Sequence, residues 1–404
     1  MKLLILSPFL PFPEVQGLRI KLASILRSLK QQGEHEVFLV SFKEKTESIP
    51  EKELAPLCSR FWIFNRPEIS RRTYLKNLVS PEPLLVWRFF NPKVAQAVAQ
   101  ITREERVDVV LFESLLMAKY YKFVYPSTTL FHAYNIEARR SARMARHQPW
   151  GPKKIYLSLI AWRLQCYEQK ILRKISYLLA CSPEDKLALE KLVGKKQIFV
   201  LPNVIDTDFY RPAGVKRYFQ RLIFLGTLWY KPNEDAAFFL LKEIFPEVKK
   251  DFPEVELEII GEGASSRLFQ LARTWKSSVK ISGFVEDIRP PLASAGIMVA
   301  PLRSGSGTKL KILVALAMGL PVVASRIACE GLTVRDEQEV LLAETPAEFK
   351  QKISLLLSDD RLRQRLIQNG RNLVEKSFSF PVLATKLKEI LSHVEQEIKP
   401  IQHG

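Results

Sequence analysis

The sequence has few cysteines and histidines and no long uninterrupted apolar run. The four cysteines, Cys58, Cys166, Cys181 and Cys329, lie far apart without a CxxC pair. That spacing argues against a disulfide framework or a zinc site and indicates a reducing, cytoplasmic compartment. The five histidines show no metal-ligand spacing, so no metal is expected. No run reaches the roughly 18 apolar residues of a membrane span, and Met1–Leu6 lacks a cleavage site, which predicts a first strand rather than a signal peptide.

Acidic residues are also scarce, at 43 against 61 lysines and arginines. The excess lies in residues 1–200, which hold 33 basic and 18 acidic side chains, whereas residues 201–404 hold 28 and 25. The first half therefore favours anionic partners, such as a membrane surface, a phosphorylated lipid or an acidic glycan. Nucleic acid is also anionic, but the chain shows no nucleic-acid recognition motif. We therefore do not expect nucleic acid as a partner.

Residues 139–174 concentrate this charge, with ten Lys or Arg and one acid, Glu168. Apolar residues recur there with helical spacing, at Ile155, Leu159, Trp162, Leu164, Tyr167 and Ile171. A basic amphipathic helix with Trp and Tyr is typical of proteins bound at a membrane surface, here the inner face of the cytoplasmic membrane. The alternative is a helix that packs on its own domain and leaves a solvated face.

Both halves of the chain alternate apolar strands with helical segments, which predicts an α/β fold of two doubly wound, Rossmann-like domains. Strands are expected in the first half at Lys2–Ser7, Glu36–Ser41, Val107–Phe112, Thr128–Phe131, Ser176–Cys181 and Gln197–Leu201. The second half restarts the pattern at Leu222–Leu225, Val255–Ile260, Val279–Ser282 and Gly296–Ala300. Residues 43–90 are poorly periodic. We expect domains at 1–203 and 204–380, followed by a helix and tail at 381–404.

The stretch Val299–Ser325 predicts a strand, a glycine loop, a helix and a further strand. Ser304–Gly307 can adopt positive φ values, and Thr308–Met318 has helical apolar spacing that ends at Gly319. A helix N-terminus attracts anions, and Lys309 and Lys311 add two cations there. The segment therefore suits a phosphate group, and an ordinary connection with solvated lysines is the alternative.

Several motifs between about 220 and 335 resemble the retaining group 1 glycosyltransferases, often called family 4, which have the GT-B fold. The matching segments are Leu225–Asn233, Ile260–Gly263, Gly283–Ile288, Ala300–Lys311 and Glu330–Leu332. Within the family they resemble the bacterial subgroup of exopolysaccharide and cell-envelope sugar transfer. The first half is similar more loosely, through Gly17–Ile20, Asn135–Glu137 and Pro202-Asn203.

The resemblance implies transfer of a sugar from a nucleotide sugar, UDP- or GDP-linked, to a lipid-linked or envelope glycan, with retention at the anomeric carbon. It implies no metal or other cofactor, because basic side chains and helix N-termini neutralise the leaving diphosphate. It also implies that a C-terminal helix returns toward the N-terminal domain. The implied donor-binding residues are Gly226, Thr227, Glu262, Phe284, Val285, Gly305, Ser306, Gly307, Thr308, Lys309, Lys311 and Val314. Acceptor-binding residues would be Gly17 and Arg19, and catalytic residues Tyr134, Asn135, Glu137 and Lys309.

Three positions depart from the family pattern. Val314 and Ser306 stand where the family usually has the two glutamates of a spaced pair, the second of which binds the ribose. Tyr134 stands where the subgroup usually has histidine, and we expect His132, two residues away, to point elsewhere. These departures leave a second hypothesis open, a catalytically reduced GT-B protein that binds glycan or a partner transferase. Asp206-Thr-Asp208 imitates a metal-binding DxD motif, but it follows the predicted linker that begins at Pro202 and is expected to be a loop.

Overall fold

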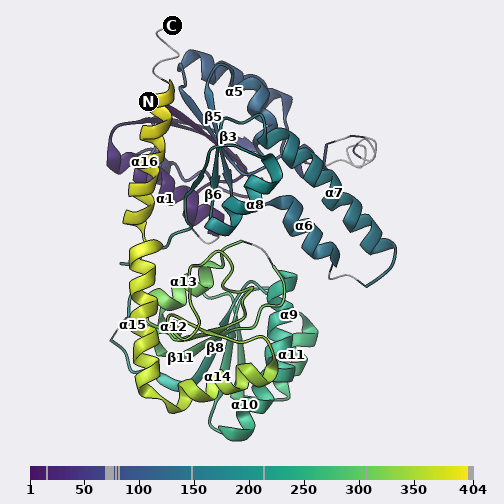
Figure 1. Cartoon of the computed structure of the whole chain (residues 1–404), viewed down its shortest axis with the longest axis vertical. Helices are drawn as coiled ribbons and strands as arrows, with labels where there is room; N and C mark the ends of the chain where they lie inside the picture. The colour runs from purple at the N-terminus through teal and green to yellow at the C-terminus, as the bar shows by residue number, and fades with distance from the viewer. Residues whose placement is uncertain are drawn as a thin grey trace. The chain divides into compact units, whose positions relative to one another are not determined.

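The computed structural model describes residues 1–14, 17–68, 77, 80, 82–146, 149–212, 214–305 and 307–398. The chain forms two compact units, Met1–Asn203 with the segment from Phe380 onward, and Val204–Ser379. Each unit is a parallel sheet with helices on its faces (Figure 1). The predicted α/β class with two doubly wound, Rossmann-like domains is therefore confirmed.

The sheet of unit 1 has seven parallel strands among the described residues, in the order β3-β2-β1-β4-β5-β6-β7. Leu4, Ile5 and Leu6 of the central strand are fully buried, as expected for a parallel strand covered on both faces. The sequence patterns predicted every strand except β3, which lies at the sheet edge within the poorly periodic region. The strands are β1 (Lys2–Ser7), β2 (Glu36–Lys43), β3 (Arg60–Asn65), β4 (Val109–Glu113), β5 (Thr128–Ala133), β6 (Tyr177–Ala180) and β7 (Ile198–Val200).

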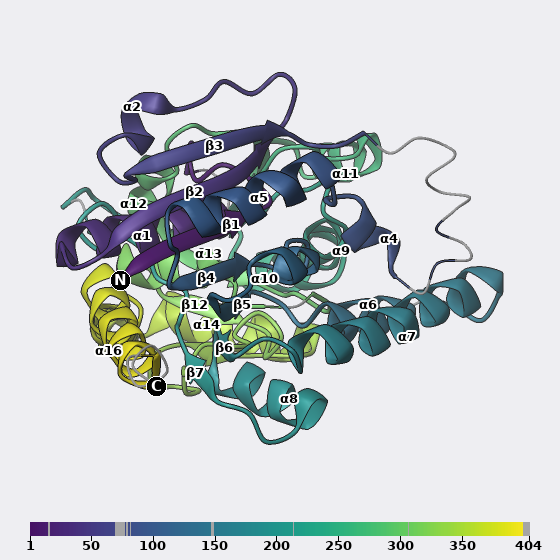
Figure 2. The same cartoon turned by 90° about the horizontal axis from the view of Figure 1, so that it is seen from above.

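The C-terminal helix α16 (Phe380–Ile398) packs against the first helix, α1 (Gly17–Gln32), so the predicted return of this helix is confirmed (Figure 2). The Gln32 side chain donates to the carbonyl oxygen of Ala384 at 3.2 Å, and Lys388 pairs with Glu34 at 2.6 Å. Leu383 and Leu387 are buried. The other helices of unit 1 are α2 (Glu51–Leu54), α4 (Leu84–Trp87), α5 (Pro92–Glu104), α6 (Glu137–Arg146), α7 (Pro152–Leu172), α8 (Pro183–Val193) and a 3₁₀ turn at Ala118–Phe123.

The basic segment forms a hairpin of two helices, α6 and α7, rather than one helix. Pro152 occupies the first turn of α7, where its fixed φ and missing N–H are tolerated. The Glu168 carboxylate accepts the backbone N–H groups of Glu137 and Ala138, at 3.1 and 3.0 Å. These donors at the start of α6 lack a partner within the helix. Burial raises the pKa of Glu168 to about 7, although both hydrogen bonds oppose the shift.

The sheet of unit 2 has six parallel strands among the described residues, in the order β10-β9-β8-β11-β12-β13. All six residues of β11 are buried. Gly296 in this strand has no room for a side chain, because an added Cβ would lie 2.3 Å from the Cα of Phe219. The strands are β8 (Tyr218–Leu225), β9 (Glu256–Ile260), β10 (Val279–Gly283), β11 (Ala295–Ala300), β12 (Val322–Ala324) and β13 (Leu341–Leu342).

The helices of unit 2 cover both faces of this sheet. They are α9 (Lys231–Phe239), a π-helical turn (Leu240–Ile244), α10 (Phe245–Asp251), α11 (Ser266–Arg273), a 3₁₀ turn (Lys276–Ser278), α12 (Arg289–Ser294), α13 (Leu310–Ala317), α14 (Pro346–Ser358) and α15 (Asp360–Ser377). Helix α9 begins at Lys231, so Asn233 lies within its first turn. The Asn233 amide donates to the carbonyl oxygen of Thr227 at 2.9 Å.

Arg371 of α15 links three segments of unit 2. Its guanidinium donates to the carbonyl oxygens of Thr207, Tyr210 and Ala317, at 2.9, 2.6 and 2.7 Å. The last of these belongs to the final turn of α13. One side chain therefore ties the chain that enters unit 2 to the helix that follows the glycine loop.

Arg371→Ala should lower the free energy of unfolding of unit 2 by about 2–4 kcal/mol, because three partly buried carbonyl oxygens lose a charged donor. Urea denaturation followed by tryptophan fluorescence measures this. Arg365→Ala, at an exposed position of the same helix, is the control and should change stability by less than about 0.5 kcal/mol. Equal losses in the two variants would contradict the assigned role.

Candidate functional site

Four loops follow the carboxyl ends of β8, β9, β10 and β11 in unit 2, and they contain all of the predicted donor residues except Lys311 and Val314, which lie in α13. Backbone hydrogen bonds join three of the loops. The N–H of Gly226 donates to the carbonyl oxygen of Ile260, and that of Gly261 donates to Gly283, both at 2.9 Å. The carboxyl edge of an open parallel sheet is where ligands bind in such folds. The structure therefore brings these segments together at the expected edge.

Glycines are required where the loops pass one another. A Cβ on Gly261 would lie 1.9 Å from the carbonyl oxygen of Gly226. A Cβ on Gly226 would lie 2.6 Å from Nζ of Lys311 and 2.7 Å from Cγ of Asn233. Glycine is thus required at both positions, because any side chain there would push the neighbouring loops apart.

Lys311 is held in this crossing by Asn233, from 78 residues away in sequence. Its Nζ donates to Oδ1 of Asn233 at 2.8 Å and lies 4.9 Å from the centroid of the Phe224 ring. Desolvation, and to a lesser extent the nearby charge of Lys309, lowers the pKa of Lys311 to about 7. A bound anion would reverse this shift, because it stabilises the charged form of the amine.

The glycine loop leads into α13 in a conformation that depends on glycine. Gly305 and Gly307 have φ values of +125° and +70°. The Lys309 side chain donates to the carbonyl oxygen of Gly307. Lys309 is also the N-cap residue of α13, without a side-chain cap, and the first turn holds no acid.

This helix start offers polar groups to a ligand. The N–H groups of a first helical turn have no partner within the helix. The hydroxyl of Thr308 is buried without a hydrogen-bond partner in the described part of the chain. These groups and the two lysines form an anion-binding arrangement. Ser306, the remaining predicted residue of this loop, lies outside the described residues.

The loops after β8 and β10 carry exposed aromatic rings, and the loop after β9 carries Glu262. Phe284 is 66% exposed and Val285 packs against the core of unit 2. The backbone carbonyl of Glu262 accepts the N–H groups of Leu228 and Trp229, at 2.7 and 3.3 Å, and its side chain is exposed. Trp229 is 64% exposed; it was not among the predicted residues, although its place directly after the Gly226 loop could have suggested it.

Val314 lies in the middle of α13 and is only 6% exposed. It belongs to the apolar core of unit 2, and a valine side chain accepts no hydrogen bond. Its assignment to the donor site stays a prediction.

Unit 1 holds a buried polar cluster at the carboxyl edge of its own sheet. Glu113 ends β4, and its carboxylate accepts the Tyr134 hydroxyl and lies 3.3 Å from Nδ1 of His132. The rings of His132 and Tyr134 lie 4.2 Å apart. Nε2 of His132 lies 3.6 Å from Sγ of Cys181. The expectation that His132 points elsewhere is therefore wrong, because His132 in β5 and Tyr134 just after it both reach the carboxylate of Glu113.

The order Cys181–His132–Glu113 resembles a nucleophile triad, but its environment suppresses nucleophilic chemistry. Burial raises the pKa of the Cys181 thiol to about 12, so the thiolate that would react is scarce. Desolvation lowers the pKa of His132, and Glu113 opposes that shift. Desolvation also raises the pKa of Tyr134 well above its ordinary value, and Glu113 raises it further.

Lys21 is a second buried charge in unit 1. It donates to the carbonyl oxygens of Leu201, at 3.1 Å, and Pro202, and desolvation lowers its pKa to about 8. Sequence reasoning missed Lys21, Glu113 and Cys181. The one available signal was an acid directly after an apolar strand, at Glu113.

The remaining predicted residues of unit 1 are mostly engaged within the chain. Gly17 is the exposed first residue of α1. Arg19 pairs with Glu47 at 2.5 Å and donates to the carbonyl oxygen of Phe12 at 3.1 Å. Glu137 pairs with Arg140 at 2.7 Å, and desolvation raises its pKa. Asn135 is partly buried in the turn between β5 and α6.

The DxD-like segment Asp206–Asp208 forms a turn. Asp206 accepts the N–H groups of Asp208 and Phe209, at 3.0 and 2.8 Å, so this segment is a turn, as expected. The described residues contain no group of three or more His, Cys, Asp or Glu placed to hold a metal. No helix within the described ranges is long and apolar enough to span a membrane.

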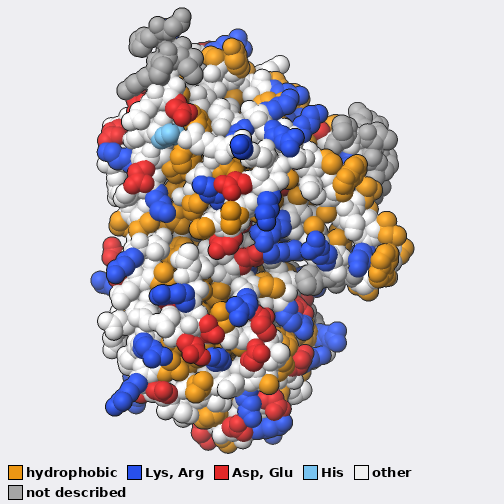
Figure 3. All heavy atoms as spheres, in the orientation of Figure 1, with side chains coloured by type: hydrophobic (Ala, Val, Ile, Leu, Met, Phe, Trp, Pro, Cys, Tyr) orange, Lys and Arg blue, Asp and Glu red, His pale blue; other side chains and the backbone are white. Residues whose placement is uncertain are grey.

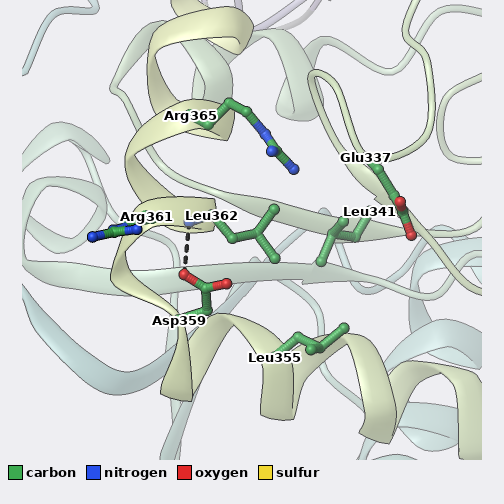
Figure 4. Close-up of a pocket in the computed structure, with 7 residues that line it drawn as sticks. All are labelled: Glu337, Leu341, Leu355, Asp359, Arg361, Leu362 and Arg365. Carbon is green, nitrogen blue, oxygen red and sulfur yellow. Dashed lines mark hydrogen bonds between the residues drawn. The ribbon is translucent and has the colours of Figure 1, made fainter.

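An open pocket in unit 2 lies away from the glycine loops (Figure 4). It is lined by residues of β13, α14 and α15, among them Leu341, Leu355 and Arg365. Leu341 is the first residue of its strand, so the pocket lies at the amino edge of the sheet. None of the predicted site residues lines it.

Comparison with known proteins agrees with this geometry. Residues 219–359 match the family model of group 1 glycosyl transferases. A phosphatidyl-myo-inositol mannosyltransferase of Mycobacterium tuberculosis is 27% identical over 206 residues, which is 48% of this chain and 53% of that protein. The UDP-Gal:alpha-D-GlcNAc-diphosphoundecaprenol alpha-1,3-galactosyltransferase of Escherichia coli is 25% identical over 232 residues, or 53% and 59% of the two chains. The chain thus spans little more than half the length of these curated relatives.

The fold is shared along nearly the whole chain. The crystal structure of Anabaena Alr3699/HepE in complex with UDP superposes with a TM-score of 0.70 at 16% identity, over 97% of this chain and 100% of that one. This likeness agrees with the two parallel-sheet units described above. Residues 219–359 thus resemble a group 1 glycosyl transferase domain, and the chain has the two-unit GT-B fold.

Proposed function

We propose that the protein transfers a sugar from a nucleotide sugar to a lipid-linked or envelope glycan. The observation that carries the proposal is the pair Lys309 and Lys311 at the glycine loop before α13, inside the group 1 domain. Two cations and a helix N-terminus suit a diphosphate. The relatives support the substrate classes, because the E. coli relative is named for a UDP sugar and a diphosphoundecaprenol-linked acceptor and HepE was crystallised with UDP.

The proposed reaction retains the configuration at the anomeric carbon, as the sequence resemblance implies. The glycosidic bond to the diphosphate breaks, and Lys309 and Lys311 stabilise the negative charge that develops on the leaving oxygen. The acceptor hydroxyl attacks the same face of the sugar, and its proton passes to a diphosphate oxygen. The scheme needs no metal or other cofactor. UDP and GDP sugars both fit it.

The charge of the first half completes the proposal. Residues 1–200 hold 33 basic and 18 acidic side chains. This positive charge favours an anionic acceptor and binding to the inner surface of the cytoplasmic membrane, so the proposal places the protein in the cytoplasm.

A second candidate function is a catalytically reduced protein that binds glycan or a partner transferase. Val314 favours it, because this buried apolar side chain occupies the position that the family resemblance assigns to a ribose-binding glutamate. Calorimetry with UDP-, GDP- and dTDP-sugars, followed by product detection with lipid-linked glycans, separates the two. Absence of binding to every donor would count against the transferase, and sugar transfer by the pure protein would exclude the reduced form.

Lys309→Ala should weaken nucleotide diphosphate binding by about 10- to 100-fold, because one charge-assisted hydrogen bond is lost. Calorimetric titration with the donor found in the screen measures it. Lys250→Ala is the matched control, since Lys250 is exposed in α10, a helix that leads to the amino edge of the sheet. Equal affinity in the two variants would place the diphosphate elsewhere.

Donor binding should take up a proton near about pH 8, because Lys311 is then mostly neutral and a bound diphosphate favours its charged form. The uptake should shrink toward about pH 6, where the free amine is already protonated. Calorimetry in buffers of different ionisation enthalpy measures the proton, and the difference between the wild type and Lys311→Met isolates this lysine. The proposal fails here if the two proteins take up protons equally at both pH values.

A further inference from the structure

Helix α7 has two apolar faces, and only one is buried. The buried face packs on unit 1 and includes Ala161, Leu164, Tyr167 and Ile171. The other face consists of Ile155, Tyr156, Leu159 and Trp162, which are 63, 58, 52 and 61% exposed. At about 100° per residue, these four side chains share an arc of roughly 120°, whose centre lies about 140° from the centre of the buried face. A surface helix normally carries one apolar stripe, so the second face requires an explanation.

The exposed apolar surface continues onto the neighbouring parts of the hairpin. Trp150, just before α7, is 86% exposed, and Met144 of α6 is 55% exposed. We call these six residues the hairpin patch: Met144, Trp150, Ile155, Tyr156, Leu159 and Trp162. Figure 3 shows hydrophobic side chains gathered over the end of this hairpin, with lysines and arginines beside them. Apolar residues clustered in this way usually mark an interaction site, whereas scattered ones do not.

The charged side chains of the hairpin between Glu137 and Glu168 are all basic. Residues 138–167 contain seven lysines and arginines and no aspartate or glutamate. The two acids that flank this stretch are turned inward: Glu137 pairs with Arg140 at 2.7 Å, and Glu168 is fully buried against the start of α6. Nζ of Lys154 lies 5.1 Å from the centroid of the Trp150 ring. The hairpin thus presents aromatic and aliphatic side chains within a cationic surround.

We propose that the hairpin patch inserts into the interfacial layer of an anionic lipid bilayer. Tryptophan and tyrosine favour the depth of the lipid headgroups, aliphatic side chains favour the acyl boundary, and the cations attract anionic headgroups. A second copy of this chain fits poorly, because two such faces would bring like charges of the two basic hairpins together. This inference rests on the proposed function in one respect: an enzyme bound at the membrane would meet a lipid-linked acceptor there.

The test is cosedimentation of the full chain with vesicles of phosphatidylglycerol and phosphatidylcholine in equal parts, and with pure phosphatidylcholine. We expect binding to the anionic vesicles that falls with added salt, and far weaker binding to the neutral ones. Leu159→Ser should weaken anionic vesicle binding by about fivefold or more, because an inserted leucine is lost. Leu187→Ser is the matched control, since Leu187 is 58% exposed on α8 of the same unit.

Equal binding by the wild type and both leucine variants would overturn insertion in favour of adhesion by charge alone. Absence of wild-type binding to anionic vesicles would overturn the proposal entirely. Self-association in solution that Leu159→Ser abolishes would assign the patch to a second copy instead. Donor titration of the same preparations keeps the two proposals apart: lost vesicle binding with intact nucleotide binding rejects only the hairpin, and the reverse result rejects only the transferase.

Discussion

The close passage of the backbone at Gly226 and Gly261 is the constraint on which the candidate site depends. With a side chain at Gly261, its Cβ would stand 1.9 Å from the Gly226 carbonyl oxygen, so the loops after β8 and β9 could not adopt their present course. The same course brings Leu228 and Trp229 to the carbonyl of Glu262 and lets Lys311 approach Asn233. The positions of cation and aromatic ring therefore follow from two residues that have no side chain.

The two units differ in how their polar groups are satisfied. In unit 1, Glu113 is surrounded by Tyr134 and His132, and Lys21 by two carbonyl oxygens. These groups compensate one another and need no ligand. In unit 2, two lysines stand at a helix N-terminus, where cations oppose the helix dipole, and burial lowers the pKa of Lys311. An anion would relieve both effects, which is why the physical argument for ligand binding centres on unit 2.

Buried parallel strands were the most predictable part of the fold, because both of their faces are apolar. Lys2–Ser7 was predicted with the bounds that the structure has. The edge strand β3 was missed, since its residues are only partly buried and flanked by polar ones. The prediction of a single basic helix at 139–174 overlooked the break before Pro152.

The candidate site was predictable as a set of loops and not as a set of contacts. Parallel strands bring their carboxyl ends to one edge, so Gly226, Glu262 and Gly305 could be grouped from the sequence. The partnership of Lys311 with Asn233 depends on how the side chains pack in three dimensions and has no local signal. The direction of His132 was predicted wrongly, because its shared contact with Tyr134 is made through Glu113, a residue of the neighbouring strand β4.

The return of α16 to unit 1 makes unit 2 an insertion within unit 1. A ribosome completes Val204–Ser379 before it adds the helix that covers α1, so the face of α1 around Gln32 lacks α16 during all of that synthesis. Domains generally fold as units in the order in which they emerge. Unit 2 can therefore reach its folded state while unit 1 is still incomplete. Unit 1 is completed only when α16, which is synthesised after all of unit 2, docks on α1.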